Sequence, residues 1–273
     1  MPHPTPPTTN PARAAKPRTR TRRLRRSAVV TVLGALALVI GQATAAQASV
    51  LTALPQNADG LEQTFSPAYD YDGDGCYATA AIGLDGTINP GLKLGGDVNG
   101  HCHDLAQLNN SNTYSRTKCN NDWCAVMYAS YFEKDQVTLG PAAIGHTHDW
   151  EHVVVWIKDN TAQYVSVSQH SAYQVSAASG VRFDGTHPKI VYHKDGIGSH
   201  DFRFANTNDE PAENATGNWF YPRLVGWNGY PAGLKDKLLG ADFGSATLKI
   251  RDSDFNYALS IAEPSGISFD PNA

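Results

Sequence analysis

The most informative stretch of this sequence is Gly145-His146-Thr147-His148-Asp149-Trp150-Glu151, which leads through His152 into the apolar run Val153-Val154-Val155-Trp156-Ile157. The apolar run is typical of a buried strand. Two imidazoles and two carboxylates precede it within six consecutive positions, and such groups are costly to bury unless an opposite charge neutralises them. A bound divalent cation would supply that charge. We therefore expect a metal site at the start of a strand.

Strand geometry limits which of these side chains can share one ion. Successive side chains of a strand point to opposite faces, so Asp149 and Glu151 share a face. His146 can join them only if the backbone turns between positions 146 and 149, and Gly145 can begin such a turn. We expect a loop entering a strand, with both carboxylates on the pocket side. Carboxylates and water favour Ca²⁺ or Mg²⁺, whereas imidazoles favour zinc.

The first 48 residues have the composition of an export signal. Six arginines between positions 18 and 26 precede a short apolar segment at 28–40, and Ala46-Gln47-Ala48 offers a cleavage site. The apolar segment is shorter than the ~20 residues that span a bilayer. We therefore predict a secreted, extracellular protein with a signal peptide at 1–48 and a single domain at 49–273.

Removal of the signal makes the chain strongly acidic. Residues 1–48 carry eight basic and no acidic side chains, so the formal net charge changes from −4 to −12 without them. Such a chain is unsuited to nucleic acid and to unaided binding of anionic lipid. It is suited to recruiting cations, and we expect it to act as a monomer.

The rest of the sequence predicts a mainly β, loop-rich fold (α+β), because aromatic residues, Gly, Asn and Asp are frequent and charges are few. We expect strands at 125–132, 152–158 and 163–168, with weaker candidates at 189–193 and 247–250. Helices are expected at about 104–109 and 232–239, and 49–62 has the character of a mobile lead-in. This order of elements favours a β-sandwich with flanking helices.

The four cysteines all follow the predicted signal, at Cys76, Cys102, Cys119 and Cys124. Export to an oxidising environment predicts two disulfides, for which three pairings exist. A Cys-based zinc site is the alternative, but the spacings lack paired C-x-x-C elements.

A second acidic segment carries Asp70, Asp72 and Asp74 in a D-x-D-x-D-G run that ends at Gly75. It resembles the opening of a calcium loop, although the bidentate Glu of an EF-hand is absent. We expect a second, structural calcium site here. The alternative is a polar turn whose aspartates cap backbone amides.

The heptapeptide, the aromatic strand at 125–135 and the segments at 242–246 and 254–255 together resemble the necrosis- and ethylene-inducing-like proteins (NLPs). This family consists of secreted plant-directed cytolysins, and the four cysteines resemble its type 2-like branch. The likeness covers most of the chain after residue 48. It implies a β-sandwich similar to actinoporins and fungal lectins, with the disulfide pairs Cys76–Cys102 and Cys119–Cys124.

The same resemblance implies roles for five residues. Asp135 and Asp149 would hold a divalent cation, Ca²⁺ or Mg²⁺, directly. His146 and Glu151 would complete the site, partly through water, and His200 would be a further pocket residue. The implied activity is not enzymatic: the cation helps to bind glycosylated inositol phosphoceramide headgroups on the outer leaflet of plant plasma membranes, which are then permeabilised.

Two departures from the family pattern and two alternative functions remain. Thr147 stands where the family has Arg, and the segment between Asp135 and His146 is longer than usual.

One alternative is a secreted glycan-binding module of the same fold without lytic activity. The other is a secreted zinc hydrolase. Compared with the H-x-H-x-D-H pattern of such enzymes, Asp149 stands one position early in this sequence. That hydrolase would use His146, His148 and His152. In the plainer interpretation, His148, Trp150 and His152 pack as ordinary strand residues.

Overall fold

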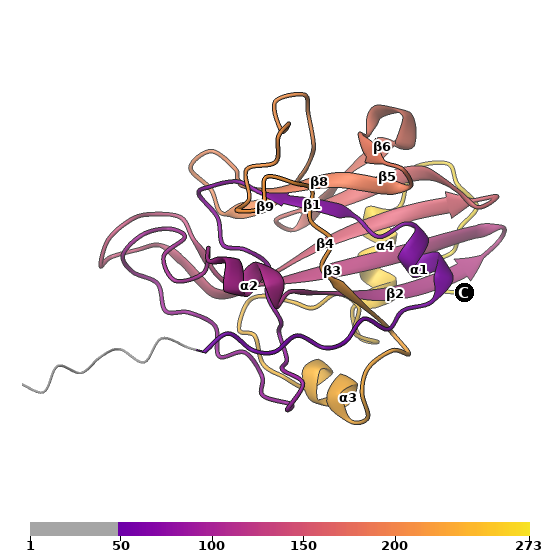
Figure 1. Ribbon diagram of the computed structural model, residues 1–273. Helices are drawn as coiled ribbons and strands as arrows, with labels where there is room; N and C mark the ends of the chain where they lie inside the picture. Colours follow the sequence, from indigo (N-terminus) through magenta and orange to yellow (C-terminus); the bar gives the residue numbers. More distant parts are fainter. Residues whose placement is uncertain (1–48) are drawn as a thin grey trace, which may run out of the picture. The chain divides into compact units, whose positions relative to one another are not determined.

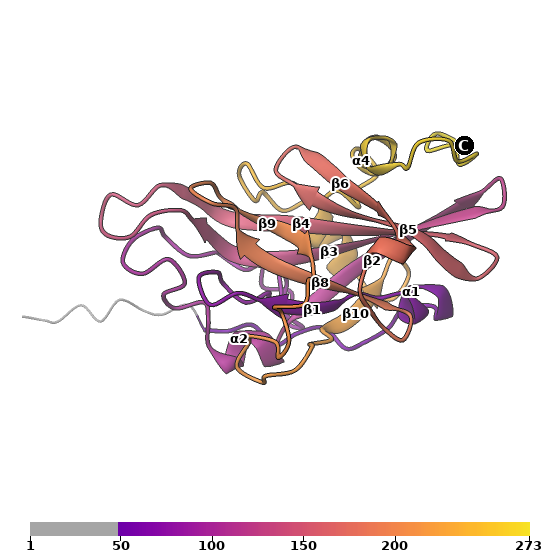
Figure 2. The same cartoon turned by 90° about the horizontal axis from the view of Figure 1, so that it is seen from above.

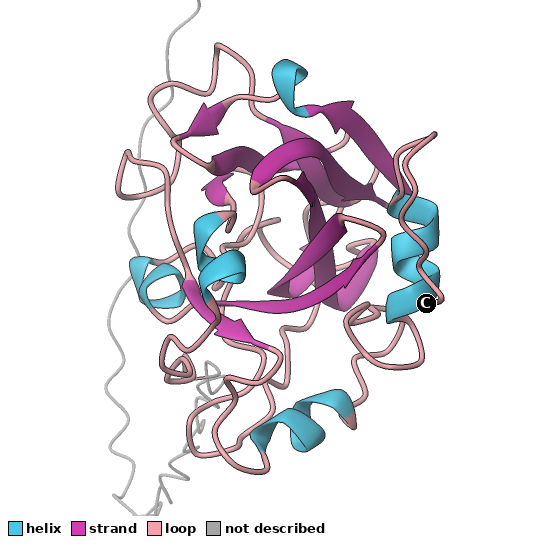
Figure 3. Cartoon of the chain, turned by 90° about the vertical axis from the view of Figure 1, so that its right-hand side faces the viewer, coloured by secondary structure: helices cyan, strands magenta, loops and turns pink. Residues whose placement is uncertain are grey.

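The computed structural model describes residues 49–273, and the predicted signal peptide lies outside the described residues. The described part is mainly β, as predicted, with two sheets and short helices around them (Figures 1 and 3). The larger sheet has the strand order β10-β2-β3-β4-β5-β6. Its strands are β10 (Arg223–Gly226), β2 (Asn112–Asn120), β3 (Trp123–Gln136), β4 (Gly145–Lys158), β5 (Thr161–Gln169) and β6 (Ala172–Ala177).

The smaller sheet faces the larger one. Its order is β1-β8-β7, with β9 paired to β8. The bounds of its strands are β1 (Ala68–Tyr71), β7 (Phe183–Asp184), β8 (His187–Lys194) and β9 (His200–Phe204). The helices are α1 (Gly60–Thr64), α2 (Leu105–Asn109), the 3₁₀ turn η1 (Ala178–Gly180), α3 (Leu234–Leu239) and α4 (Phe255–Ala262).

Strand β4 separates two apolar cores because its side chains alternate between the faces of the larger sheet. Val153, Val155 and Ile157 pack between the two sheets, against residues of β1, β8 and β9. Val154 and Trp156 point the other way, into a core closed by α3, α4 and the C-terminal segment. Figure 2 shows α4 and the smaller sheet on opposite sides of the larger sheet. A fully buried side chain of this size contributes roughly 1.5–3 kcal/mol, so the central strands hold both layers together.

The predicted strands at 125–132, 152–158, 163–168 and 189–193 are confirmed within β3, β4, β5 and β8. The predicted helices are confirmed as α2 and α3, and α3 ends at Gly240 as expected. The strand predicted at 247–250 is wrong. Leu248 and Ile250 are buried against the outer face of the larger sheet, and Lys249 N donates a hydrogen bond to His152 Nε2 at 3.0 Å, so this segment packs on the sheet without joining it.

The lead-in at 49–62 is not a loose segment. Leu54 is fully buried, and its backbone N donates to Asn112 Oδ1 at 2.8 Å. Helix α1 begins with a capping box in which Asp59 and Glu62 satisfy each other's backbone amides.

The four cysteines form the pairs Cys76–Cys102 and Cys119–Cys124, the second across the β2–β3 hairpin.

Candidate metal centre

The predicted ligands gather at one end of the space between the two sheets. Asp135 near the end of β3 lies opposite His146 near the start of β4, so their side chains are cross-strand neighbours. Asp149 and Glu151 continue the inter-sheet face that carries Val153 further along β4. All three carboxylate residues are more than nine-tenths buried. The three predicted carboxylates therefore lie in one buried region.

A break in strand alternation brings His146 toward Asp135. His148 has a φ of 65°, in the left-handed region that non-glycine residues seldom adopt. This is the turn expected between positions 146 and 149, although it lies inside β4 rather than before it. His146 Nδ1 lies 2.6 Å from the carbonyl oxygen of His148, and its Nε2 lies 3.5 Å from Asp135 Oδ2.

His200 is the cationic partner within the cluster. Its Nδ1 lies 2.7 Å from Asp135 Oδ1 and its Nε2 lies 3.1 Å from the carbonyl oxygen of Asp74. Both neighbours are acceptors, so both ring nitrogens must carry hydrogen for both bonds to form, and the imidazole is then positively charged. Burial alone would lower the pKa of His200, but the hydrogen bond and charge of Asp135 raise it above its ordinary value.

Asp149 and Glu151 have no comparable cationic partner. Tyr192 Oη donates to Asp149 Oδ2 at 2.9 Å, and Ser168 Oγ donates to Glu151 Oε2. Burial, followed by repulsion from Asp135, raises the pKa of Asp149 to about 6. Burial and the charge of Asp149 raise the pKa of Glu151 well above its ordinary value. A divalent cation would relieve both effects, because it stabilises the ionised carboxylates.

The predicted ligands do not form a compact set in the described structure. Among the described residues, the set whose ligand atoms all lie within 4.8 Å of one another is His170, Asp195 and Asp201, not the predicted set. Mg²⁺ usually keeps several waters and uses only one or two protein carboxylates, so a wider arrangement is compatible with it.

The three aspartates of the D-x-D-x-D-G run do not converge on one point. Asp70 accepts hydrogen bonds from the backbone N of Glu213 and of Asn214, at 2.9 and 3.1 Å. Asp72 pairs with Arg203 at 3.2 Å. Asp70 thus acts as the capping alternative describes. The segment instead supports the first centre, because the backbone of Asp74 holds His200.

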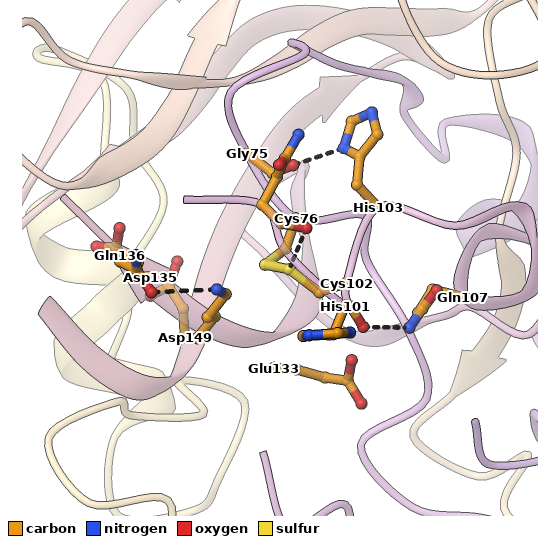
Figure 4. The surroundings of a disulfide bond; sticks show 12 residues. Gly75, Cys76, His101, Cys102, His103, Gln107, Glu133, Asp135, Gln136 and Asp149 are labelled. Carbon is orange, nitrogen blue, oxygen red and sulfur yellow. Dashed lines mark hydrogen bonds between the residues drawn. A yellow bond between two sulfur atoms is a disulfide. The ribbon is translucent and has the colours of Figure 1, made fainter. Parts of the chain in front are cut away.

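Gly75 allows this segment to approach the centre closely. A Cβ atom at this position would lie 3.1 Å from ring carbons of both His200 and Tyr192, which contact Asp135 and Asp149. The Cys76–Cys102 disulfide follows directly and fixes the segment, with Asp135 and Asp149 drawn in the same close-up (Figure 4). The second acidic motif and the first disulfide therefore help to shape the predicted metal centre.

The remaining histidines of the strand face away from the carboxylates. His148 Nδ1 lies 2.6 Å from Tyr131 Oη, and His152 is buried with its Nε2 on Lys249 N. Burial, with a contribution from the charge of Lys249, lowers the pKa of His152 to about 3, so this ring is neutral. The His146, His148 and His152 set required for a zinc hydrolase is not brought together.

The longer segment between Asp135 and His146 does not disturb their pairing. Residues 137–144 form the β3–β4 loop, closed by a hydrogen bond from Val137 N to the carbonyl oxygen of Ile144 at 2.8 Å. Gly140 N also donates to Gly96 O at 2.9 Å. The extra length therefore lies beyond the last paired residues, and Asp135 keeps its place opposite His146.

The set of His170, Asp195 and Asp201 was missed by the sequence reasoning. These residues come from the β5–β6 turn, the β8–β9 turn and β9, and no short spacing links them in the sequence. Only the pairing of β8 with β9 and the approach of the β5–β6 turn bring them together.

The chain is similar in sequence to proteins of one described family. The sequence pattern of a family described as necrosis inducing protein (NPP1) matches residues 59–262. NLP effector protein 10 of Phytophthora capsici is 32% identical over 196 residues, which cover 69% of this chain and 77% of the relative.

Solved structures resemble the chain over most of its length. One, described as NLPPya in complex with mannosamine, has a TM-score of 0.68 and 29% identity, covering 80% of this chain and 98% of the other. Another, described as non-toxic HaNLP3 protein, has a TM-score of 0.66 and 28% identity, covering 80% and 99%. Within residues 49–273, no helix has the length and apolar character needed to cross a membrane.

Proposed function

Because this chain belongs to the necrosis-inducing protein (NPP1) family, we propose that it is a secreted, non-enzymatic cytolysin that binds glycosylated sphingolipid headgroups of plant plasma membranes through a divalent cation and then permeabilises the bilayer. The observation that carries this proposal is the buried Asp149–Glu151 pair, whose acidic neighbours and burial outweigh the nearby histidines His146 and His200 and raise the pKa of Asp149.

The cation would connect the protein to a sugar. Asp135 and Asp149 would hold Ca²⁺ or Mg²⁺, with His146 and Glu151 ordering water around it. A partly hydrated ion of this kind can exchange water for sugar hydroxyl groups. It also neutralises carboxylates that would otherwise repel an anionic headgroup. The similar structure described as a complex with mannosamine supports a sugar as the bound group.

Apolar side chains at the rim of the centre support contact with a membrane. Leu139 and Ile144 belong to the β3–β4 loop, which joins Asp135 to His146, and they are 69% and 66% exposed. Ile197 in the β8–β9 turn, three residues before His200, is 97% exposed. Lys194 Nζ donates to the carbonyl oxygen of Val137 at 2.7 Å and so holds the two loops together. Exposed apolar groups gathered beside a polar site are typical of a membrane or partner surface.

Dye release from vesicles tests the proposal. Vesicles with glycosylated inositol phosphoceramide should leak in Ca²⁺ or Mg²⁺ and stay intact in chelator, and phosphatidylcholine vesicles should stay intact throughout. Asp149→Asn should abolish release. Asp122→Asn is the matched control, because Asp122 is an exposed aspartate at the opposite end of β3. Release that is indifferent to chelator and to Asp149→Asn would contradict the metal role.

A second function, glycan binding without lysis, is favoured by the similarity to the structure described as non-toxic HaNLP3. The two functions share the centre and differ in membrane damage. Cation-dependent binding to the glycolipid vesicles without dye release would therefore support the non-lytic module and exclude the cytolysin.

A further inference from the structure

A second group of metal-ligating side chains lies where the β5–β6 turn meets the β8–β9 turn. His170 Nε2 is 3.7 Å from Asp195 Oδ2 and 3.7 Å from Asp201 Oδ2. Zinc bonds of about 2.0–2.2 Å at tetrahedral angles separate ligand atoms by about 3.3–3.6 Å. Both distances from His170 are thus close to the spacing that one zinc ion requires, and the three ligand atoms all lie within 4.8 Å of one another.

Asp201 supplies an independent sign that this group binds a ligand. Its side chain is only 2% exposed, and its Oδ1 has no hydrogen-bond partner in the described structure. His193 Nε2, on the neighbouring strand, lies 3.1 Å from this oxygen but without hydrogen-bond geometry. A carboxylate buried in this way is unfavourable unless a cation compensates it.

The side chain of His170 is already oriented for such a role. Its Nδ1 lies 3.1 Å from Ser199 Oγ, which leaves Nε2 directed at the two carboxylates. Metal-binding histidines almost always use their second ring nitrogen in this manner. His170 and Asp195 are about half and two-thirds exposed, so an ion can enter from solvent.

This group is separate from the centre formed by Asp135, His146, Asp149 and Glu151, called the carboxylate-rich centre below. Side chains alternate along β9, so His200 and Phe202 point to one face of the strand and Asp201 to the other. His200 contacts Asp135, whereas Asp201 contacts His170 and His193. The two groups share no residue.

We propose that His170, Asp195 and Asp201 form a zinc site, with a fourth position left for water or an exogenous ligand. Mixed imidazole and carboxylate donors in a tetrahedral arrangement favour Zn²⁺ over Ca²⁺ or Mg²⁺. The site does not depend on the proposed lytic function, because its residues are outside the centre that would hold the glycan-binding cation.

Calorimetric titration with Zn²⁺ in excess Ca²⁺ tests this site, since Ca²⁺ then fills the carboxylate-rich centre. One zinc per chain is expected. His170→Asn should weaken zinc binding more than about 100-fold, because even outer partners of a metal site contribute about 10–100-fold. Asp195→Asn should weaken it as well. Asp201 is left unchanged, because its charge also contributes, after burial and Asp149, to the raised pKa of Glu151.

The matched control is His101→Asn. His101 is an exposed histidine whose φ is 67°, against 56° for His170. In both variants, asparagine must therefore adopt the same left-handed backbone conformation. This control and Asp149→Asn should both retain zinc binding. Titration with Co²⁺ as a spectroscopic probe should give the visible absorption of a four-coordinate ion, and His170→Asn should remove it. Absence of a zinc site in Ca²⁺, retention of full zinc affinity in His170→Asn, or loss of zinc in Asp149→Asn would each overturn the proposal.

Discussion

Two acidic segments of this protein meet beside His200, and their carboxylates differ in the donors and charges that surround them. In the segment from Asp70 to Asp74, the buried aspartate receives backbone N–H groups and the next one faces Arg203. At the candidate metal centre, Asp149 accepts the hydroxyl of Tyr192 and the backbone N–H of Trp150, and Glu151 accepts the hydroxyl of Ser168, while the two carboxylates repel each other.

The difference shows which acidic motif calls for a cation. Carboxylates that accept several N–H groups, as Asp70 does, or that face an arginine, as Asp72 does, are stabilised by the protein itself. Buried carboxylates that face like charges are not, and they either stay protonated or bind an ion. Similar residue types therefore have a structural role in one segment and, as we propose, a ligand role in the other. Four predictions follow from this contrast, ordered from the largest expected effect.

Removal of Asp149 should have the largest effect on cation binding. Asp149→Asn keeps the shape of the side chain but removes the charge that faces Asp135, so the affinity for Ca²⁺ or Mg²⁺ should fall more than about 100-fold. Calorimetry measures it. An affinity within threefold of the wild type would contradict a ligand role for Asp149, and the two segments would then no longer differ in function.

Removal of Asp70 should affect stability rather than cation binding. Asp70→Ala leaves the backbone amides of Glu213 and Asn214, the second of them buried, without their acceptor, which should cost about 2 kcal/mol of unfolding free energy. Denaturant unfolding in chelator measures this cost. If the variant instead loses cation stoichiometry at unchanged stability, the D-x-D-x-D-G run is a calcium site after all.

Removal of one hydroxyl beside Asp149 should have a smaller effect. Tyr192→Phe keeps the ring that stacks on Phe132 at 3.7 Å and deletes only the donor to Asp149. We expect about a tenfold loss of cation affinity, as for other outer partners of metal sites. Tyr71→Phe serves as control, because its buried hydroxyl has no partner in the described structure. Equal losses in both variants would point to packing alone.

Between pH 5 and pH 7, the free energy of unfolding of the metal-free protein should fall by about 1 kcal/mol, whereas that of the metal-bound protein should not. The pKa of Asp149 is raised to about 6 in the folded state, mainly by burial. A raised carboxyl pKa stabilises the folded state at low pH, and this stabilisation is lost as the pH rises through about 6. The metal-free protein should therefore be less stable at pH 7 than at pH 5.

A divalent cation should reverse that trend, because it binds the ionised carboxylates and competes with protons. Thermal unfolding at both pH values, with cation and with chelator, measures the two slopes. Parallel slopes would contradict a cation held by Asp149.

Much of the fold was accessible from the sequence because hydrophobic alternation is a local signal. The run from Val153 to Ile157 and the strand at 125–132 gave the central pair of strands, and Gly240 marked the end of α3. Helix α4 was missed, although Phe255, Ala258, Leu259 and Ala262 follow the helical spacing. The segment at 247–250 was misassigned, because its apolar residues are buried against the face of the larger sheet and not within a strand.

The candidate centre was only partly accessible. The heptapeptide marked His146, Asp149 and Glu151, and the family resemblance added Asp135 and His200. The support from Asp74 and Gly75, and the group of His170, Asp195 and Asp201, could not be read in advance. These contacts depend on how β9 and the loops approach β4, and no local pattern encodes that approach.

The central claim is that one divalent cation binds between Asp135 and Asp149. The most direct measurement is an anomalous difference map from a crystal grown in Mn²⁺, which stands in for Mg²⁺ or Ca²⁺ and scatters strongly enough to be located. We predict a peak within bonding distance of carboxylate oxygens of both residues, with water completing the coordination shell. A map without a peak at this position, while ions are bound beside Asp70 and Asp72 instead, would contradict the account.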